Sequence, residues 1–346
     1  MWNHPDFADH ERVIYARDAD AGLWAIVAIH STALGPAFGG CRMWPYADGA
    51  EALTDALRLS HGMTCKAAIC GLPYGGGKSV ILGDPRRAKT RALLRAMGRV
   101  VESLGGRYVI ADDIGTTLDD LALMREETRH TAAATAAARE PLAVTAYGVL
   151  MATRAAVEHR LGREDLAGLR VAVQGLGNVG MPLCGYLYEA GARLVVADLD
   201  PARAARAETA FDARSVGADA IYDQDIDLFA PCARGAVLND DTIPRLRAGI
   251  VCGGANTQLA ERRHAAALAE RGIAYVPDYV ANAGGVIDFH QERTGDDRPE
   301  AVLRAVGRLH GITADVLRRA AESGRTPQEA ADGIVAARLA AARRSR

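Results

Sequence analysis

The chain has 346 residues, of which 49% are hydrophobic, and its formal net charge is −2 at pH 7. This length is typical of about two domains, and so small a charge gives no general attraction to nucleic acid or to an anionic membrane. No apolar run reaches the ~18 residues of a membrane-spanning helix, and no basic segment followed by an apolar one begins the chain. We therefore expect a cytoplasmic α/β protein.

The cysteines give no sign of a metal site or a disulfide framework. There are six, at positions 41, 65, 70, 184, 232 and 252, and most stand in apolar surroundings. No two of them form a Cys-x-x-Cys pair, and no histidines accompany them at zinc-finger spacing. The sequence therefore predicts buried free thiols and no bound metal.

The N-terminal part predicts a hairpin followed by a packed helix. Strand-like stretches at 12–15 and 23–30 flank a turn that contains glycine. From 48 to 63 the apolar residues recur at helical spacing, and Asp48 is available to cap the helix N-terminus. Lys66 should therefore lie near the end of this helix.

A glycine-rich stretch at 71–79 presents Lys78 on closely packed backbone. A phosphate-binding P-loop requires a glycine six positions before its lysine, where this chain has Leu72. Phosphoryl transfer is therefore an alternative with little support, and ATP binding would distinguish it. A ligand sensor without catalytic activity is a third alternative, which residue spacing alone leaves open.

A strand–turn–helix–strand pattern occupies the middle of the chain. An apolar strand at 169–174 leads into the glycine-rich turn 175–180, and a helix at 181–190 and a strand at 193–197 follow. This is the βαβ unit of a Rossmann dinucleotide-binding domain. A structural unit of the same shape without a ligand is the alternative.

The glycines and the acid of this unit have separate roles. Gly175 permits the tight turn, Gly177 lets the backbone approach a pyrophosphate, and Gly180 lets helix and strand pack closely. Asp198 stands 23 positions after Gly175, where a carboxylate can hydrogen-bond a ribose 2′-hydroxyl and repel a 2′-phosphate. NAD is therefore favoured over NADP, although the nearby Arg203 weakens this preference.

Two further segments bear on the domain organisation. Between 131 and 144 the alanine runs lose amphipathic periodicity, and a Glu-Pro pair interrupts the chain, so we place the boundary between two domains there. From 327 to 346 the chain is rich in alanine and predicts a helix with a basic, solvated end.

Several blocks of sequence identify a family resemblance. The stretch 30–44 is one, and others follow in order at 62–66, 75–78, 111–117, 145–148, 230–233, 254–256 and 277–285. Together, from about residue 10 to 335, they closely resemble the amino-acid dehydrogenases that act on leucine, valine, phenylalanine and glutamate. The resemblance implies reversible oxidative deamination of an L-amino acid by NAD, which gives a 2-oxo acid and ammonium.

The resemblance also implies roles for three residues. By position, Lys66 matches the lysine that binds the substrate carboxylate, Lys78 the catalytic lysine, and Asp113 the acid–base aspartate. The chemistry fits these roles, because water must attack the iminium that hydride loss leaves, and this step needs a base. Two ammonium groups in one partly desolvated cleft disfavour each other's charge, which would favour a neutral Lys78.

One position bears on the substrate side chain. The glutamate enzymes have a lysine for the distal carboxylate where this chain has Phe38. A buried ring cannot pair a charge, so glutamate should be rejected and an apolar amino acid accepted. Phenylalanine enzymes tend to have a small residue here, so we favour a branched aliphatic substrate of the leucine or valine type. Phenylalanine or another aromatic amino acid is the alternative.

The expected site residues form two sets. The catalytic residues Lys78 and Asp113 are joined by the substrate-binding residues Lys66, Phe38, Gly39, Gly40, Met63, Ala111, Asn282, Leu309 and Ile312. The cofactor-binding residues are Gly175, Gly177, Asn178, Val179, Gly180, Asp198, Thr145, Cys232, Ala233, Ala255, Asn256 and again Asn282. For most pocket residues, and above all for Leu309 and Ile312, a place in the core is the alternative.

The resemblance implies a two-domain α/β fold with a cleft between the domains. Residues 1–140 would form the α/β substrate-binding and oligomerisation domain, to which 322–346 return, and 141–321 would form the Rossmann NAD-binding domain. The family forms oligomers, so we expect a homo-oligomer that acts on a small molecule without a nucleic-acid partner. The chain departs from the family pattern at 125–130, with the alanines that follow, and at 141–144.

Overall fold

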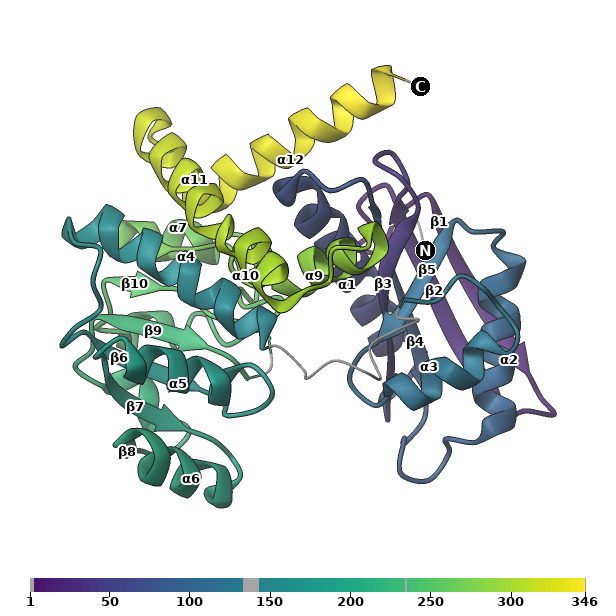
Figure 1. Cartoon of the computed structure of the whole chain (residues 1–346), viewed down its shortest axis with the longest axis horizontal. Coiled ribbons are helices and arrows are strands. Elements are labelled where there is room, and N and C mark those ends of the chain that lie inside the picture. The colour runs from purple at the N-terminus through teal and green to yellow at the C-terminus, as the bar shows by residue number, and fades with distance from the viewer. Residues whose placement is uncertain (1–2, 133–142, 234, 346) are drawn as a thin grey trace. The chain divides into compact units, whose positions relative to one another are not determined.

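The computed structural model describes residues 3–132, 143–233 and 235–345 (Figure 1). The chain divides into two compact units, one of Met1–Pro141 with Ala337–Arg346 and the other of Leu142–Ala336. The expected boundary segment at 131–144 lies largely outside the described residues. The chain re-enters the first unit at Ala337, whereas the sequence analysis placed this return at residue 322.

A mixed five-stranded sheet forms the first unit, in the order β1-β2-β4-β3-β5. The expected hairpin is confirmed, since β1 and β2 pair antiparallel. Strand β4 runs antiparallel to β2 but parallel to β3, which in turn runs parallel to β5. The strands are β1 (Arg12–Asp18), β2 (Leu23–Ser31), β3 (Ala37–Trp44), β4 (Gly75–Leu82) and β5 (Tyr108–Asp112).

Side chains from both faces of this sheet are buried. Along β2 they alternate between a core shared with α2 (Arg91–Ser103) and α3 (Leu118–Arg125) and a core shared with α1 (Gly49–Cys70). The first core takes Ala25, Val27 and Ile29, and the second takes Ile26 and Ala28. This alternation is the period of two of a strand, and burial on both faces explains the nearly continuous apolar run.

Helix α1, which carries Lys66, is fixed at its start and along its side. As expected, the Asp48 side chain caps it by accepting hydrogen bonds from the backbone N–H groups of Ala50 and Glu51, at 2.9 and 2.8 Å. The helix lies against β4 where Gly76 has no side chain, since a Cβ there would be 2.1 Å from the Thr64 backbone nitrogen. Close backbone contact therefore sets the height of α1 above the sheet.

Three histidine rings pack against one another, and one of them, His61, belongs to α1. The ring centroids of His10 and His30 are 4.9 Å apart, and those of His30 and His61 are 4.7 Å apart. His10 Nε2 hydrogen-bonds the Leu57 carbonyl oxygen at 3.1 Å, and His30 Nδ1 hydrogen-bonds the Thr64 hydroxyl at 2.8 Å. Burial lowers the pKa of both rings, that of His30 to about 3. His10 and His30 are therefore neutral at pH 7, and we call the three rings together the histidine stack.

The second unit contains a parallel six-stranded sheet in the order β11-β10-β9-β6-β7-β8. Numbered from its first strand, this is the 3-2-1-4-5-6 order of a dinucleotide-binding fold, in which the strand order reverses between β6 and β9. The expected βαβ unit is confirmed. The strands are β6 (Arg170–Gln174), β7 (Arg193–Ala197), β8 (Arg214–Ser215), β9 (Leu228–Pro231), β10 (Ile250–Val251) and β11 (Ala274–Tyr275).

The helices of this part of the chain include the one expected at its end, α12. None of the helices in the described ranges combines the length and the apolar character needed to cross a membrane. Their bounds are α4 (Val144–Leu161), α5 (Gly180–Glu189), α6 (Pro201–Phe211), α7 (His264–Glu270), α8 (Asp278–Ala281), α9 (Gly284–Thr294), α10 (Pro299–Gly307), α11 (Leu309–Ser323) and α12 (Pro327–Arg344).

All six cysteines are free thiols, as expected from the sequence. Five are buried, while Cys232, which follows β9, is partly exposed. The thiol groups of Cys41 and of Cys232 are both shielded from water, although Cys232 as a residue is partly exposed. This burial raises the pKa of both thiols to about 12, so both remain protonated at neutral pH.

Acid should destabilise the first unit through the histidine stack. The pKa of His30 falls from 6.5 to about 3 on folding, so the unfolded state binds the proton first, and stability is lost as the pH falls from 6.5 toward 3. We expect a loss of up to ~1.4 kcal/mol per pH unit for each such histidine. Urea unfolding between pH 8 and 4.5, followed by tryptophan fluorescence, measures it, because all three tryptophans belong to the first unit.

Two variants test whether His30 causes this loss. His30→Gln should make the decline in stability with falling pH shallower, whereas His159→Gln, at an exposed position of α4, should leave it unchanged. Equal slopes for the parent and His30→Gln would show that His30 is not responsible.

Candidate active site and cofactor cradle

Lys78 and Asp113 form an ion pair in the first unit. Lys78 lies on β4 and is only 5% exposed, and its Nζ donates a hydrogen bond to Asp113 Oδ2 just after β5. Strand β3 runs between these two strands, and its Gly40 leaves room for the pair. A Cβ at Gly40 would be 2.8 Å from the Asp113 Cβ and 3.2 Å from the Lys78 Nζ. The structure therefore brings together the two residues to which the sequence analysis gave the proton-transfer roles.

The backbone that carries Asp113 is fixed against β3. The Thr116 hydroxyl accepts a hydrogen bond from the Asp113 N–H at 3.0 Å and donates one to the Cys41 carbonyl oxygen at 2.7 Å. Gly115 has a φ of +83°, and a Cβ there would be 2.0 Å from the Met43 carbonyl oxygen. These contacts fix the backbone from which the Asp113 side chain extends toward Lys78.

Arg42 is a second cation on Asp113, and the sequence analysis did not assign it. Its Nε donates to Asp113 Oδ2 at 3.2 Å, and its Nη1 contacts Asp55 Oδ1 and Oδ2 at 3.2 and 2.8 Å. The Tyr46 hydroxyl also donates to Asp55, at 2.6 Å. The position of Arg42 within the family-like stretch 30–44 was a signal that could have pointed to it. Its partners could not be found in the same way, because Asp55 and Asp113 lie 13 and 71 residues away in the sequence.

These cations determine the protonation of Asp113. Burial by itself would raise the pKa of this carboxyl, but the Lys78 ammonium and the Arg42 guanidinium outweigh burial and hold it well below its usual range. Burial, with the charge of Asp113 nearby, raises the pKa of the adjacent Asp112. Lys78 therefore faces an ionised carboxylate, a neighbour that the expected repulsion between lysines did not take into account.

The other substrate residues expected in the first unit lie on α1, β3 and β5. Lys66 and Met63 are partly buried on α1, and Ala111 of β5 pairs with Gly40. Phe38 of β3 is buried, with its ring centroid 6.2 Å from that of Tyr74. At Gly39 a Cβ would be 1.8 Å from the Gly77 carbonyl oxygen, so the backbones of β3 and β4 meet directly there.

Leu309 and Ile312 lie on α11 in the second unit. Leu309 is fully buried, and its Cδ1 is 2.8 Å from the place that a Cβ on Gly148 of α4 would take. Ile312, three residues along the helix, is partly buried. The packing of Leu309 against α4 is that of a core residue.

The glycine turn of the second unit has the geometry that a dinucleotide needs. Gly175 adopts a φ of +91°, and a Cβ there would be 2.7 Å from the Ala233 backbone. A Cβ at Gly180 would be 1.8 Å from the Gly175 carbonyl oxygen, so this glycine permits the close packing of α5. At Gly177, by contrast, a Cβ would meet nothing within 4 Å. The open side of Gly177 fits a pyrophosphate at the N-terminus of α5.

The remaining cofactor residues lie around this turn. A Cβ at Gly254 would be 2.4 Å from Val179 Cγ1 and 3.6 Å from Cys232 Sγ, so the segments after β9 and β10 meet the turn. Asn282 Nδ2 donates to Asn256 Oδ1 at 2.9 Å, while its own Oδ1 is buried with no hydrogen-bond partner in the described part of the chain. Such an acceptor suits a donor on a bound ligand. We call the glycine turn 175–180, together with Cys232, Gly254, Asn256 and Asn282, the cofactor cradle.

Asn178, Ala255 and Thr145 complete the expected cofactor set. Asn178 is an exposed residue of the glycine turn, and Ala255 is buried beside Asn282, whose Nδ2 contacts its carbonyl oxygen at 3.3 Å. Thr145 lies in the first turn of α4, and its Cα is 3.0 Å from the place that a Cβ on Gly284 would take. Each of them lies in the second unit.

Asp198, the expected ribose acceptor, is held on the glycine turn at the end of β7. Its Oδ2 accepts a hydrogen bond from the Leu176 N–H at 2.6 Å, and its Oδ1 accepts one from the Asp200 N–H at 2.8 Å. Each carboxylate oxygen has a second lone pair with which it can still accept a ribose hydroxyl. Arg203 Nη1 lies 3.9 Å from Asp198 Oδ2, and its Nε lies 3.5 Å from Asp200 Oδ2.

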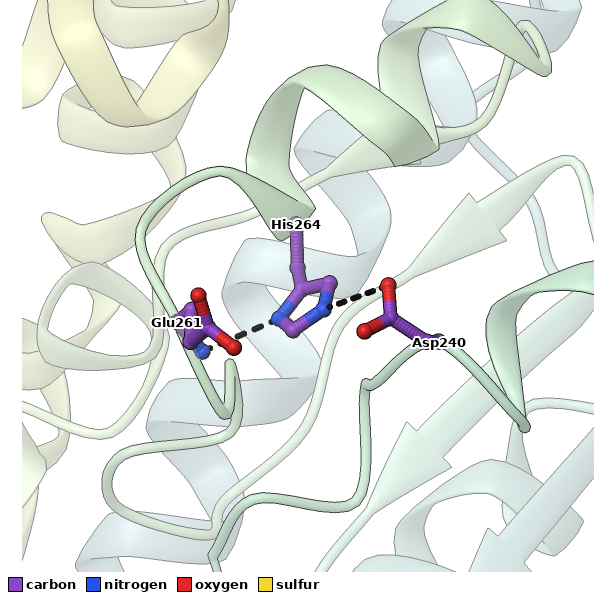
Figure 2. A group of neighbouring side chains, drawn as sticks. All are labelled: Asp240, Glu261 and His264. Atoms are coloured by element: carbon purple, nitrogen blue, oxygen red, sulfur yellow. Dashed lines mark hydrogen bonds and ion pairs between the residues drawn. The ribbon is translucent and has the colours of Figure 1, made fainter.

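Asp240, Glu261 and His264 of the second unit have the spacing of a metal site (Figure 2), with ligand atoms within 4.8 Å of one another. However, the Glu261 N–H donates to His264 Nδ1 at 2.9 Å, so His264 Nε2 carries the proton and faces Asp240 Oδ1 at 3.3 Å. Arg263 pairs with both carboxylates. Neither ring nitrogen offers a lone pair, and we assign no metal to this cluster.

Comparisons with known proteins agree with this arrangement. The family model "Glu/Leu/Phe/Val dehydrogenase, dimerisation domain" matches residues 10–130, and "Glutamate/Leucine/Phenylalanine/Valine dehydrogenase" matches 138–216 and 199–346. A leucine dehydrogenase of Thermoactinomyces intermedius is 46% identical over 349 residues, which cover 100% of this chain and 95% of that protein. A valine dehydrogenase of Streptomyces coelicolor is 43% identical over 98% of this chain and 95% of its own length.

A solved structure shows the same fold. The crystal structure of L-tryptophan dehydrogenase from Nostoc punctiforme matches with a TM-score of 0.81 and 42% sequence identity, over 97% of each chain. The sequence matches span both units, and the fold agrees over nearly the full length. The chain therefore belongs to the Glu/Leu/Phe/Val dehydrogenase family.

Proposed function

We propose that this protein oxidatively deaminates a branched aliphatic L-amino acid, of the leucine or valine type, to its 2-oxo acid and ammonium, with NAD as the oxidant. The observation that carries the proposal is the Lys78–Asp113 pair beside Gly40. The leucine and valine dehydrogenases among its relatives support the aliphatic substrate. The similar tryptophan dehydrogenase supports an aromatic substrate as the alternative.

In this proposal three side chains act on the substrate. Lys66 of α1 binds the substrate carboxylate, and Asp113 exchanges protons with the substrate nitrogen. A nicotinamide, when bound, supplies the acceptor for the hydride that leaves the substrate Cα. Lys78, once it has released its proton to solvent, takes a proton from the water that attacks the iminium carbon. Asp113 returns the proton that it took from the substrate nitrogen to the nitrogen of the resulting carbinolamine. As the C–N bond breaks, the same carboxylate accepts the hydroxyl proton, so that ammonia and the 2-oxo acid are released.

The choice of NAD rests on the charges around the ribose position. Asp198 would accept a hydrogen bond from the 2′-hydroxyl and would repel a 2′-phosphate. Arg203, the cation that could offset this repulsion, lies beside two carboxylates, those of Asp198 and Asp200. The charges of Asp198, Asp200 and Arg203 thus suit NAD better than NADP.

The choice of an apolar substrate rests on Phe38. Its ring is buried on β3, two residues before Gly40, the glycine beside which Lys78 and Asp113 meet. A glutamate side chain would bring its carboxylate to a ring that offers no charge and no hydrogen-bond donor, and a desolvated carboxylate without a partner is costly.

We also propose that the chain works as a homo-oligomer. The description of the family model that matches residues 10–130 as a dimerisation domain supports this. The cytoplasmic location expected from the sequence stays a prediction.

Loss of either proton-transfer group should nearly abolish turnover. We expect the parent to form NADH with leucine or valine, and Lys78→Ala and Asp113→Asn each to lower kcat by at least the ~10²-fold typical of a positioned acid or base. NAD binding should change little, because the cradle lies on other residues. Initial rates with leucine, valine, isoleucine, phenylalanine, tryptophan and glutamate test this, after circular dichroism has verified folding. A variant that kept more than about a tenth of the parental kcat would exclude its residue from proton transfer.

Asp198→Ala should relax the choice of cofactor. The variant loses the acceptor for the ribose and the repulsion of a 2′-phosphate, so kcat/KM for NAD should fall while that for NADP rises. Asp200→Asn is the matched control, because it alters the neighbouring carboxylate that also faces Arg203. A ratio of NAD to NADP activity that Asp198→Ala leaves at the parental value would refute the assignment of the acid.

Phe38→Ala should shift the substrate preference from leucine toward phenylalanine. If the ring fills the end of the side-chain pocket, its removal opens room for a phenyl group and should change transition-state discrimination by ~1 to 3 kcal/mol. Phe229→Ala is the control, since it removes a buried ring from the core of the second unit. We expect that variant to lose stability, by the ~3 to 5 kcal/mol typical of buried Phe→Ala changes, with an unaltered ratio. The same outcome for Phe38→Ala would place Phe38 in the core.

A further inference from the structure

Arg42 joins the Lys78–Asp113 pair to another carboxylate, that of Asp55. Its side chain is 16% exposed, lies on β3 and spans from the end of β5 to helix α1. Lys78 Nζ and Arg42 Nε both donate to the same atom, Asp113 Oδ2. Two cations and two anions thus form one group with no net charge.

Turnover would disturb this balance. When Lys78 gives up its proton, Asp113 loses the charge of its nearest cation, although its side chain is only 21% exposed. A carboxylate shielded from water and left without a cation tends to take up a proton. It would then recapture the proton that Lys78 has to lose before it can act as a base. Arg42 remains charged throughout, because a guanidinium does not deprotonate in a protein.

We propose that Arg42 is a positioning residue for the deamination, which holds Asp113 Oδ2 in place and keeps this carboxylate ionised while Lys78 releases its proton. The inference rests on the proposed roles of Lys78 and Asp113. The contacts of Arg42 also explain why an arginine stands here. Its planar fork contacts two carboxylates on different elements at once, and the single ammonium of a lysine cannot reproduce that geometry.

Asp55 and Tyr46 hold Arg42 from the other side. Asp55 accepts from Arg42 Nη1 with both carboxylate oxygens and from the Tyr46 hydroxyl with Oδ2. Burial and the contact with Asp55 raise the pKa of Tyr46, so this hydroxyl stays protonated and keeps donating. In the described part of the chain, the titratable groups that face the cluster are Lys78 on β4, Tyr108, Asp112 and Asp113 on and after β5, Asp55 on α1, and Cys41 and Tyr46 in and after β3.

The charges predict opposite effects for two variants on the pH dependence of deamination. Its kcat should rise with pH as Lys78 releases its proton. Arg42→Gln removes a cation, so proton release becomes harder and the rising limb of kcat should move to higher pH, with kcat lowered at least tenfold. Asp55→Asn removes an anion, so the limb should move to lower pH. Arg42→Lys keeps the charge but loses the fork, so its limb should stay near the parental pH while part of kcat is restored.

The test measures kcat and KM for leucine and NAD from pH 7 to 11 in these three variants and in Arg58→Gln. Arg58 is the matched control, because it is an arginine of α1 whose charged partner in the described part of the chain is Asp6, with which it forms an exposed ion pair. We expect its pH profile and kcat to equal those of the parent, and the KM for NAD to stay within about twofold in all four variants.

Each outcome supports or overturns the inference. Limbs that move in opposite directions for Arg42→Gln and Asp55→Asn support it, and limbs that stay at the parental pH overturn it, even if both variants are slow or less stable. Asp55→Asn alone decides the matter if Arg42→Gln is too slow to follow. Lys78→Ala and Asp113→Asn, measured alongside, separate the two proposals. If those variants keep their activity, the proposed function fails; if they lose it while the limbs stay fixed, only the role of Arg42 fails.

Discussion

Direct contact between the backbones of β3 and β4 is the constraint on which the first unit depends. Gly39 meets the Gly77 carbonyl oxygen where any side chain would collide, and Gly40, the next residue, leaves the space in which Lys78 reaches Asp113. The same glycines that weaken a strand in general are required here, because two charged side chains from either side of β3 must meet over it. The Lys78–Asp113 ion pair therefore depends on the glycines of β3, the strand that lies between the two residues.

The second unit obtains its site from topology more than from side chains. Its strand order reverses between β6 and β9, and the carboxyl ends of these strands and of β10 lie around one glycine turn. Backbone N–H groups and small residues form most of this surface, which suits a ligand recognised by its phosphates. Asp198 and Asn282 are exceptions, since they add a carboxylate and an orphaned amide oxygen.

Local signals made much of this fold predictable. The β1–β2 hairpin, the Asp48 cap and the turn at 175–180 each depend on residues a few positions apart, and the structure has all of them. The carboxylate that pairs with Lys78 lies 35 residues away, so no local signal in the sequence predicted this ion pair. Arg42 was missed for the same reason. The sequence around an arginine does not indicate which carboxylates it will pair with, and Asp55 reaches Arg42 only because α1 packs against the sheet.

Helix α1 carries residues for two different tasks, recognition of the substrate carboxylate and support of Arg42. It carries Lys66, assigned to the substrate carboxylate, and Asp55, which holds Arg42, and eleven residues of helix place them about 16 Å apart along one rigid rod. A displacement of this rod would alter substrate recognition and proton affinity together. Evolution or design of new specificity is therefore freer at side chains that line a pocket, such as Phe38, than in the placement of α1. Because α1 carries both Lys66 and Asp55, a shift of this helix cannot change one of the two tasks without changing the other.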